Sequence, residues 1–269
     1  MLSISNLIPP AVAASGAAAC APEALHPALW RAHQLGRHDG AALPTGFAAL
    51  DAELPGGGWP ARALTELLLP QPGIGELRLL APALAAVGAA GRSLVWFDPP
   101  AVPCAWTLRA LGIATERLGL VRSRDGARGR ARARLPAADT LWALEQALRS
   151  GHVGAVLAWL PQRLRADTLR RLQLAAQAHD GPAFVLREVD ACRQPSPAPL
   201  RLLLAAGGAD RLALRVLKRR AAPLQHTLQL ALPPVLSPAA RSRAAQRRVV
   251  PGAGSAAAVR VGDADSVVA

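Results

Sequence analysis

The stretch that decides the fold is "LLLPQPGIGELRLL", residues Leu67 to Leu80. It predicts a buried strand, a turn rich in Gly and Pro, and the start of a helix. A phosphate-binding loop has the same layout, because its glycines let backbone N–H groups converge on an anion at a helix N-terminus. Such a loop also needs a Lys followed by Ser or Thr. Glu76 and Leu77 stand in those positions, and the single lysine of the chain is Lys218.

The glutamate is electrostatically unsuited to phosphate. A carboxylate in the first turn of a helix is stabilised by the helix dipole by about 0.3–1 kcal/mol. At about 4 Å it repels a phosphate charge by about 4 kcal/mol at an effective dielectric constant of about 20. We therefore interpret the loop as a vestigial phosphate loop that binds no cofactor, with the residues Gly73, Gly75, Glu76 and Leu77.

Other parts of a nucleotide hydrolase are missing as well. The apolar run 93–98 ends in Asp98, which is followed by two prolines and by no Glu that could activate a water molecule. The run 153–161 carries Trp159 and Leu160 where a metal-binding acid is expected. The three cysteines have neither disulfide nor metal-ligand spacing. The sequence thus predicts no catalytic residue, no metal site and no enzymatic activity.

Apolar runs alternate with helical stretches along most of the chain. The predicted strands are 63–69, 93–98, 153–161 and 182–188. The predicted helices are 76–91 (bent or shortened at Pro82), 104–113, one capped by Asp139 and one capped by Asp167. Residues 199–220 and 226–233 read as consecutive strands with a Gly-Gly turn. Together they predict an α/β fold with a mostly parallel central sheet, helices on both faces and C-terminal antiparallel strands.

The predicted organisation has three parts. Residues 1–24 form a flexible, Ala-rich leader without the features of a signal peptide, residues 25–236 form one domain that begins with a helix over 26–36, and residues 237–269 form a disordered basic tail. No run of the chain is long and apolar enough for a membrane helix, so we expect a cytoplasmic protein.

Six tryptophans supply most of the aromatic side chains. We assign Trp30, Trp142 and Trp159 to the core, since each lies in an apolar run. Trp106 lies in a short helix flanked by prolines, and we expect it to be exposed.

The net charge is +13 with a pI of about 11.6, and it comes almost entirely from arginine. Such a balance indicates nucleic acid or an acidic partner, whereas a GC-rich genome would produce the same composition. The segment 121–136 is either a DNA-phosphate contact or a solvated loop. The strand end 218–220 either faces a partner or protects a sheet edge. The candidate contact residues are Arg122, Arg124, Arg128, Arg130, Lys218, Arg219 and Arg220.

The order of several weak motifs resembles the RecA-type ATPase core. The match begins at "LPTGFAALDAELPGGGWPARALTEL" and continues through "PGIGELRLL", "RSLVWFD", "LRALGI", "LWALEQALRSG" and "AVLAW", covering about residues 41 to 190. The resemblance implies a RecA-like P-loop NTPase core within the RecA/SulA-like superfamily. The resemblance concerns the fold. The residues themselves show that the phosphate-binding lysine of such a core is missing here.

More narrowly, "GIGELRLL", "ALWRAHQLG", "VLAWLP" and "RLALRVLKRR" resemble the ImuA family. That resemblance implies a non-catalytic adaptor in SOS-induced, mutagenic translesion DNA synthesis. Its expected partners are an ImuB-type polymerase homologue, RecA and the error-prone polymerase III alpha subunit. Two alternatives stay open: a SulA-type inhibitor that binds the tubulin-like cell-division protein, and a divergent, ATP-binding recombinase-like ATPase.

Overall fold

The computed structural model describes residues 42–122, 137–161, 164–235, 237, 239–240 and 242–243. The chain divides into two units, residues 1–232 and 233–269, and the eight strands among the described residues belong to the first. The predicted leader, the helix expected over 26–36, Trp30 and most of the predicted tail lie outside the described residues.

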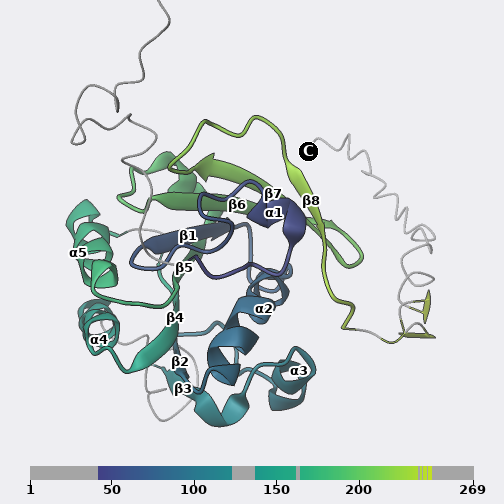
Figure 1. Ribbon diagram of the computed structural model, residues 1–269, viewed down its shortest axis with the longest axis horizontal. Coiled ribbons are helices and arrows are strands. Elements are labelled where there is room, and N and C mark those ends of the chain that lie inside the picture. The colour runs from purple at the N-terminus through teal and green to yellow at the C-terminus, as the bar shows by residue number, and fades with distance from the viewer. Residues whose placement is uncertain are drawn as a thin grey trace, which may run out of the picture. The chain divides into compact units, whose positions relative to one another are not determined.

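The first unit is built on one eight-stranded sheet with the order β3-β2-β4-β5-β1-β6-β7-β8 (Figure 1). The strands are β1 (Leu64–Leu69), β2 (Ser93–Phe97), β3 (Leu118–Val121), β4 (Val153–Trp159), β5 (Ala183–Glu188), β6 (Leu200–Gly208), β7 (Arg211–Lys218) and β8 (Leu228–Ala231). Neighbouring strands are parallel from β3 to β6. The pairs β6–β7 and β7–β8 are antiparallel. The predicted mostly parallel sheet with C-terminal antiparallel strands is confirmed.

Helices cover both faces of the sheet (Figure 1). The helices are α1 (Ala48–Asp51), α2 (Glu76–Ala89), α3 (Ala105–Ala110), α4 (Ala137–Arg149) and α5 (Ala166–Gln177), with 3-10 turns η2 (Thr115–Arg117) and η3 (Val189–Arg193). Helices α2 and α3 contribute to one apolar cluster, and α4 and α5 contribute to another. Strand β1 lies between the clusters, so all six of its residues are buried, as its continuous apolar sequence predicts.

Three local predictions need correction. Helix α2 is not shortened at Pro82, since it continues to Ala89. Gly46 packs so closely against this proline that a Cβ on Gly46 would lie 2.5 Å from the Pro82 Cβ. Helix α4 begins at Ala137 and α5 begins after Arg165, so Asp139 and Asp167 lie in first turns and cap neither helix. Each helix starts one or two residues before its aspartate, where the carboxylate still interacts favourably with the helix dipole.

Strand β3 was not predicted from the sequence. It has four residues at the sheet edge, and none of them is buried. Such a short segment carries too little apolar alternation to be recognised as a strand.

The segment before β1 is fixed by the residues of the "TGFAALD" motif. The Thr45 backbone N–H donates to the Asp51 carboxylate at 2.8 Å, and the Phe47 N–H donates to the Thr45 hydroxyl at 3.1 Å. Leu43 and Trp59 form an isolated antiparallel bridge. These bonds give partners to backbone N–H and C=O groups that lie outside any helix or strand of the sheet and would otherwise be buried without one.

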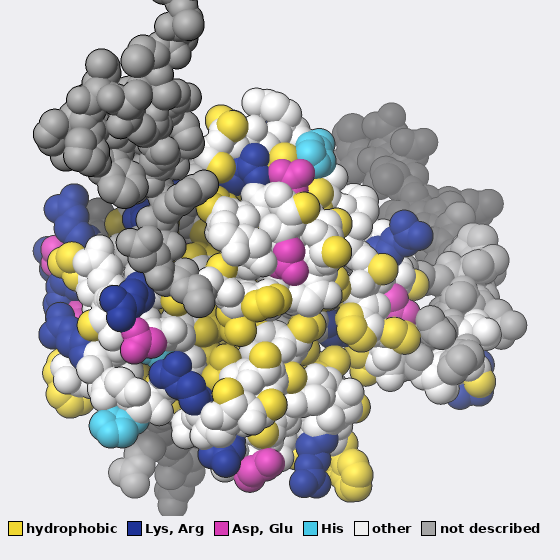
Figure 2. All heavy atoms as spheres, viewed as in Figure 1, with side chains coloured by type: hydrophobic (Ala, Val, Ile, Leu, Met, Phe, Trp, Pro, Cys, Tyr) yellow, Lys and Arg dark blue, Asp and Glu magenta, His cyan; other side chains and the backbone are white. Residues whose placement is uncertain are grey.

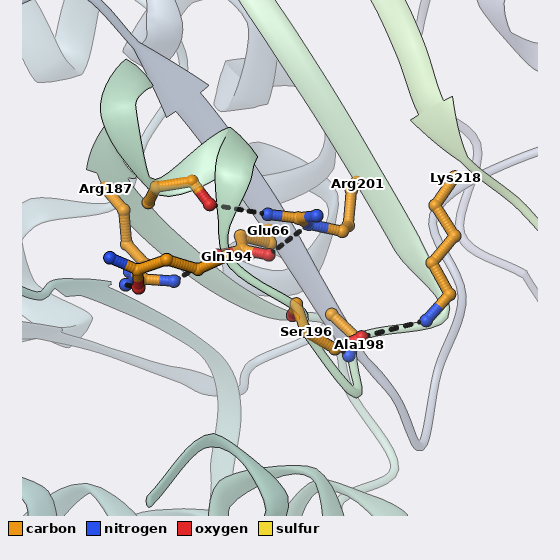
Figure 3. A network of polar contacts seen from close by, with 8 residues as sticks. Glu66, Arg187, Gln194, Ser196, Ala198, Arg201 and Lys218 are labelled. Carbon is orange, nitrogen blue, oxygen red and sulfur yellow. Dashed lines mark hydrogen bonds and ion pairs between the residues drawn. The ribbon is translucent and has the colours of Figure 1, made fainter. Parts of the chain in front are cut away.

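A buried ion network joins three of the parallel strands (Figure 3). The Glu66 carboxylate on β1 accepts from Arg187 Nη1 at 2.7 Å and from Arg201 Nε at 2.6 Å. The guanidinium groups also donate to the Gln194 side chain and to the Ala191 carbonyl. All three charged side chains are less than a tenth exposed. Because removing one member of such a network leaves an uncompensated buried charge, we assign Glu66 a structural role.

Candidate functional site

The loop between β1 and α2 is a glycine-containing turn that leads directly into a helix. Gly73 and Gly75 adopt φ values of 89° and 124°, which lie in the left-handed region that favours glycine. Helix α2 begins directly after Gly75, with Glu76 in its first turn as predicted. This turn aims backbone N–H groups at one point in front of the helix.

The Glu76 side chain occupies that point. One carboxylate oxygen accepts from the Gly73 N–H at 2.7 Å, and the other accepts from the Gly75 N–H at 3.1 Å. The residue is only 3% exposed. The loop therefore already holds an anion, supplied by its own chain. The sequence placed the carboxylate beside the loop but did not predict that it turns back into it. Glu76 is the first residue of the helix, whereas the glutamate of a capping box is the third.

The C-terminal strands cover the last glycine of the loop. A Cβ on Gly75 would lie 2.6 Å from Leu232 Cδ1 and 3.8 Å from Leu212 Cδ1. Arg78, in the first turn of α2, forms an ion pair at 2.6 Å with Asp210 in the β6–β7 turn. An apolar side chain and an ion pair thus hold the strands β7 and β8 over this end of the loop.

Asp98 and Trp159 stand at the two strand ends where a nucleotide hydrolase carries its catalytic and metal-binding acids. Asp98 has a φ of 47°, and its backbone N–H donates to the Val121 carbonyl. Trp159 ends β4 with its ring 5.7 Å from that of Trp96, in an edge arrangement. Among the described residues no group of three His, Cys, Asp or Glu side chains could hold a metal ion. Within the same part of the chain, no helix has the length and hydrophobicity that a membrane span requires.

Of the predicted basic contacts, the structure describes Arg122 and the three residues 218–220. Arg122 follows β3, and Arg124, Arg128 and Arg130 lie outside the described residues. Lys218 Nζ donates to the Ser196 carbonyl at 2.9 Å (Figure 3), and burial, followed by the nearby Arg201 charge, lowers its pKa.

Arg219 is engaged within the chain. It donates to the Glu53 carboxylate at 2.9 Å and to the Ala222 carbonyl at 2.6 Å. Arg220 is exposed. That these residues contact DNA or a partner stays a prediction.

An exposed apolar surface lies at the start of α3, and we call residues 101–106 the Trp106 surface. Trp106 is 84% exposed and Val102 is 68% exposed. Ala101, Cys104 and Ala105 are exposed as well, and none of the six residues is charged. The prediction that Trp106 is exposed is confirmed. A large aromatic side chain in an uncharged exposed patch is typical of protein–protein interfaces.

The thiol on this surface is chemically perturbed. The backbone N–H of Thr107, the Thr107 side chain and the backbone N–H of Trp106 lower the pKa of Cys104 by hydrogen bonding. The thiolate form is therefore more accessible than in an ordinary cysteine.

The assignment of Trp142 to the core was wrong. Trp142 lies on α4 and is 62% exposed, whereas Leu144 and Leu148 of the same helix are buried. The apolar run around it suggested burial, but it lies two turns before the exposed Arg149 and so on the outer face of the helix. Trp159 is partly buried and packs against the core cluster, as predicted.

The central part of this chain is similar to known proteins. The family described as "Cell division inhibitor SulA" matches residues 64–183. This segment is similar to SulA. It includes β1, the loop between β1 and α2 that the Glu76 side chain fills (the closed loop), the Trp106 surface, α4 and α5. It ends as β5 begins.

Two relatives named cell division inhibitor SulA show the same similarity. The protein of Photorhabdus laumondii is 30% identical over 125 residues, which are 46% of this chain and 63% of the relative. The protein of Edwardsiella piscicida is 35% identical over 100 residues, which are 37% of this chain and 52% of the relative. The chain spans less than two thirds of the length of either relative. The similarity to SulA supports the RecA/SulA-like superfamily, without singling out the ImuA family within it.

Proposed function

We propose that this chain is a SulA-type, non-catalytic inhibitor that binds the tubulin-like cell-division protein during the response to DNA damage. The observation that carries the proposal is the Trp106 surface, which lies inside the SulA-like segment and presents an uncharged aromatic patch. The proposal includes a cytoplasmic location. It also includes descent from a RecA-like P-loop core, which is supported by the loop between β1 and α2 and by the central strand order β3-β2-β4-β5-β1.

A partner that covers Trp106 would remove its indole from water. Burying roughly 150 Å² of an indole side chain contributes about 4 kcal/mol before the entropic cost of association. Exposed aromatic side chains of this kind dominate interface energies. An inhibitor that acts by covering a surface of the division protein needs no catalytic reaction. This agrees with a loop between β1 and α2 whose N–H groups are already occupied by Glu76.

The test uses the purified division protein and the full chain. We expect direct binding, and we expect Trp106→Ala to weaken it by at least about 30-fold, which corresponds to about 2 kcal/mol. Leu174→Ala is the matched control, since it also removes an exposed apolar side chain and lies on a different helix. Expression of the unsubstituted chain should cause filamentation, and expression of the Trp106→Ala variant should not. Failure of the chain to bind the division protein would refute the proposal.

A second candidate is the ImuA-type adaptor, and one observation favours it. Residues 42–63 and the strands β6, β7 and β8 lie outside the SulA-like segment. The three strands extend its sheet, Leu212 and Leu232 lie over Gly75, and Gly46 packs against Pro82 of α2. An adaptor could use this added surface to hold the ImuB-type polymerase homologue, RecA or the polymerase III alpha subunit. Capture of these three proteins in parallel with the division protein separates the candidates.

The absence of catalysis is part of both proposals. A Glu76→Lys, Leu77→Thr double variant restores the missing pair of side chains but leaves Trp159 and Leu160 at the end of β4, where a metal-binding acid is expected. We expect no ATP hydrolysis by this variant, and measurable turnover would bring back the third alternative, a divergent ATPase.

A further inference from the structure

Two large apolar side chains are exposed on the other side of the sheet from the Trp106 surface. Trp142 on α4 is 62% exposed, and Leu174 on α5 is 56% exposed. The inner faces of both helices are anchored in the core by buried leucines, so these outward side chains contribute nothing to that packing. Neither belongs to the function proposed above.

An ion pair brings the two side chains into one patch. Glu145 lies one turn after Trp142, and Arg171 lies one turn before Leu174. Arg171 Nη2 is 2.9 Å from Glu145 Oε2, which joins these turns of the two helices. Residues three apart on a helix share a face, so Trp142 and Leu174 flank the same ion pair.

Arginines border the patch, and the exposed carboxylates of Asp139 and Asp167 lie in the first turns of the two helices. Arg149 follows Trp142 by two turns on the same helix face, and Arg170 is exposed beside Arg171. Arg171 is 57% exposed, while its partner Glu145 is only 6% exposed and adds little negative surface. Figure 2 shows Lys and Arg side chains gathered along the edge at which Figure 1 draws α4 and α5. We call this patch the α4–α5 surface; its residues are Trp142, Leu174, Arg149, Arg170 and Arg171.

We propose that the α4–α5 surface binds an acidic amphipathic segment of a protein partner. The apolar residues of such a segment would cover Trp142 and Leu174, and its carboxylates would meet the arginines. A nucleic acid fits less well, because Leu174 offers no ring on which a base can stack.

The two surfaces can be occupied at the same time. The helix that carries Trp106 packs into the cluster of α2, and α4 and α5 pack into the cluster on the opposite face of the sheet. The binding of the acidic segment therefore goes beyond the proposed inhibition and leaves the Trp106 surface free. The chain would link two proteins, which raises the local concentration of each near the other.

The test uses the full chain and a fluorescein-labelled synthetic helical peptide. The peptide carries Leu at positions i, i+3, i+4 and i+7 and Glu at most other positions, and its binding is measured by fluorescence anisotropy. We expect Trp142→Ala to weaken binding at least about ten-fold, as is typical of a central aromatic residue. Arg170→Glu should weaken it similarly and remove most of its salt dependence. Arg109→Glu, the same change of charge at an exposed position of α3, and Trp106→Ala should leave it unchanged.

Two comparison probes decide the class of partner. One is a peptide of the same composition with its leucines scrambled, and the other is a single-stranded oligothymidine of equal charge. Equal affinity for the scrambled peptide, tighter binding of the oligonucleotide, or insensitivity to Trp142→Ala would overturn the proposal. Since Trp106→Ala serves as a control here and as the decisive variant for the division protein, failure of one proposal is distinguishable from failure of the other.

Discussion

Glu76→Ala tests the closed loop most directly. The substitution removes the acceptor of two N–H groups, one at 2.7 Å and one at 3.1 Å. A hydrogen bond to a charged group contributes about 1.5–3 kcal/mol, and the helix dipole adds about 0.3–1 kcal/mol. Gly73 is exposed, so water can replace its bond, whereas Gly75 lies beneath Leu232 and loses more. We therefore expect the free energy of unfolding to fall by about 2–3 kcal/mol, less than the sum of both bonds.

The assay is urea unfolding followed by tryptophan fluorescence. Glu76→Gln keeps one acceptor oxygen and loses the charge, so it should cost about half as much as Glu76→Ala. Glu116→Ala is the matched control, because Glu116 is an exposed carboxylate at the first turn of η2 and its removal should cost less than about 0.5 kcal/mol. If the slope of the free energy of unfolding against urea concentration is unchanged, the variants differ in stability and not in the compactness of either state.

A second measurement asks whether the emptied loop accepts an external anion. Inorganic pyrophosphate should raise the urea midpoint of Glu76→Ala and leave that of the unsubstituted chain unchanged. The reasoning is refuted if Glu76→Ala is as stable as the Glu116→Ala control, or if pyrophosphate stabilises the unsubstituted chain equally.

Three further predictions concern the interior of the fold. Burial, followed by the Arg92 charge, lowers the pKa of His179 to about 4. As the pH falls below the unfolded pKa of about 6.5 the unfolded chain binds the proton first, so stability should fall by about 2 kcal/mol from about pH 7 to about pH 5. Urea midpoints at both pH values check this, and His179→Gln should flatten the difference. Glu66→Ala leaves two buried guanidinium groups without their carboxylate and should cost about 3–5 kcal/mol by urea unfolding. Gly75→Ala should cost more than Gly73→Ala, because both positions have positive φ but only Gly75 has a neighbour, Leu232, within 3 Å of the added Cβ; equal thermal midpoints for the two variants would contradict this.

The parallel core could be read from the sequence because its strands are buried on both faces. Runs such as "LTELLL" are nearly uniformly apolar, and helices with clear periodicity separate them. The missed strand β3 and the misplaced aspartate caps lie where the chain offers only a few informative residues. A boundary shift of one or two residues changes a cap into a first-turn carboxylate without changing the periodicity that predicts the helix.

The candidate sites were only partly predictable. The missing lysine follows from composition, since the chain has a single lysine far from the loop. The direction of the Glu76 side chain does not, because it depends on the φ values of two glycines. Trp106 was recognised as exposed from its flanking prolines. Trp142 was misassigned, since an exposed tryptophan on an amphipathic helix has the same local pattern as a buried one until the helix is placed against the sheet.

The tethered carboxylate of Glu76 has a consequence for how the protein responds to its surroundings. A ligand that binds the native state adds to stability in proportion to the logarithm of its concentration. An anion that belongs to the chain cannot diffuse away, so we expect the stability of this loop to be independent of nucleotide concentration. The unsubstituted protein should therefore keep one loop conformation in starved and in growing cells alike, insensitive to their energy supply.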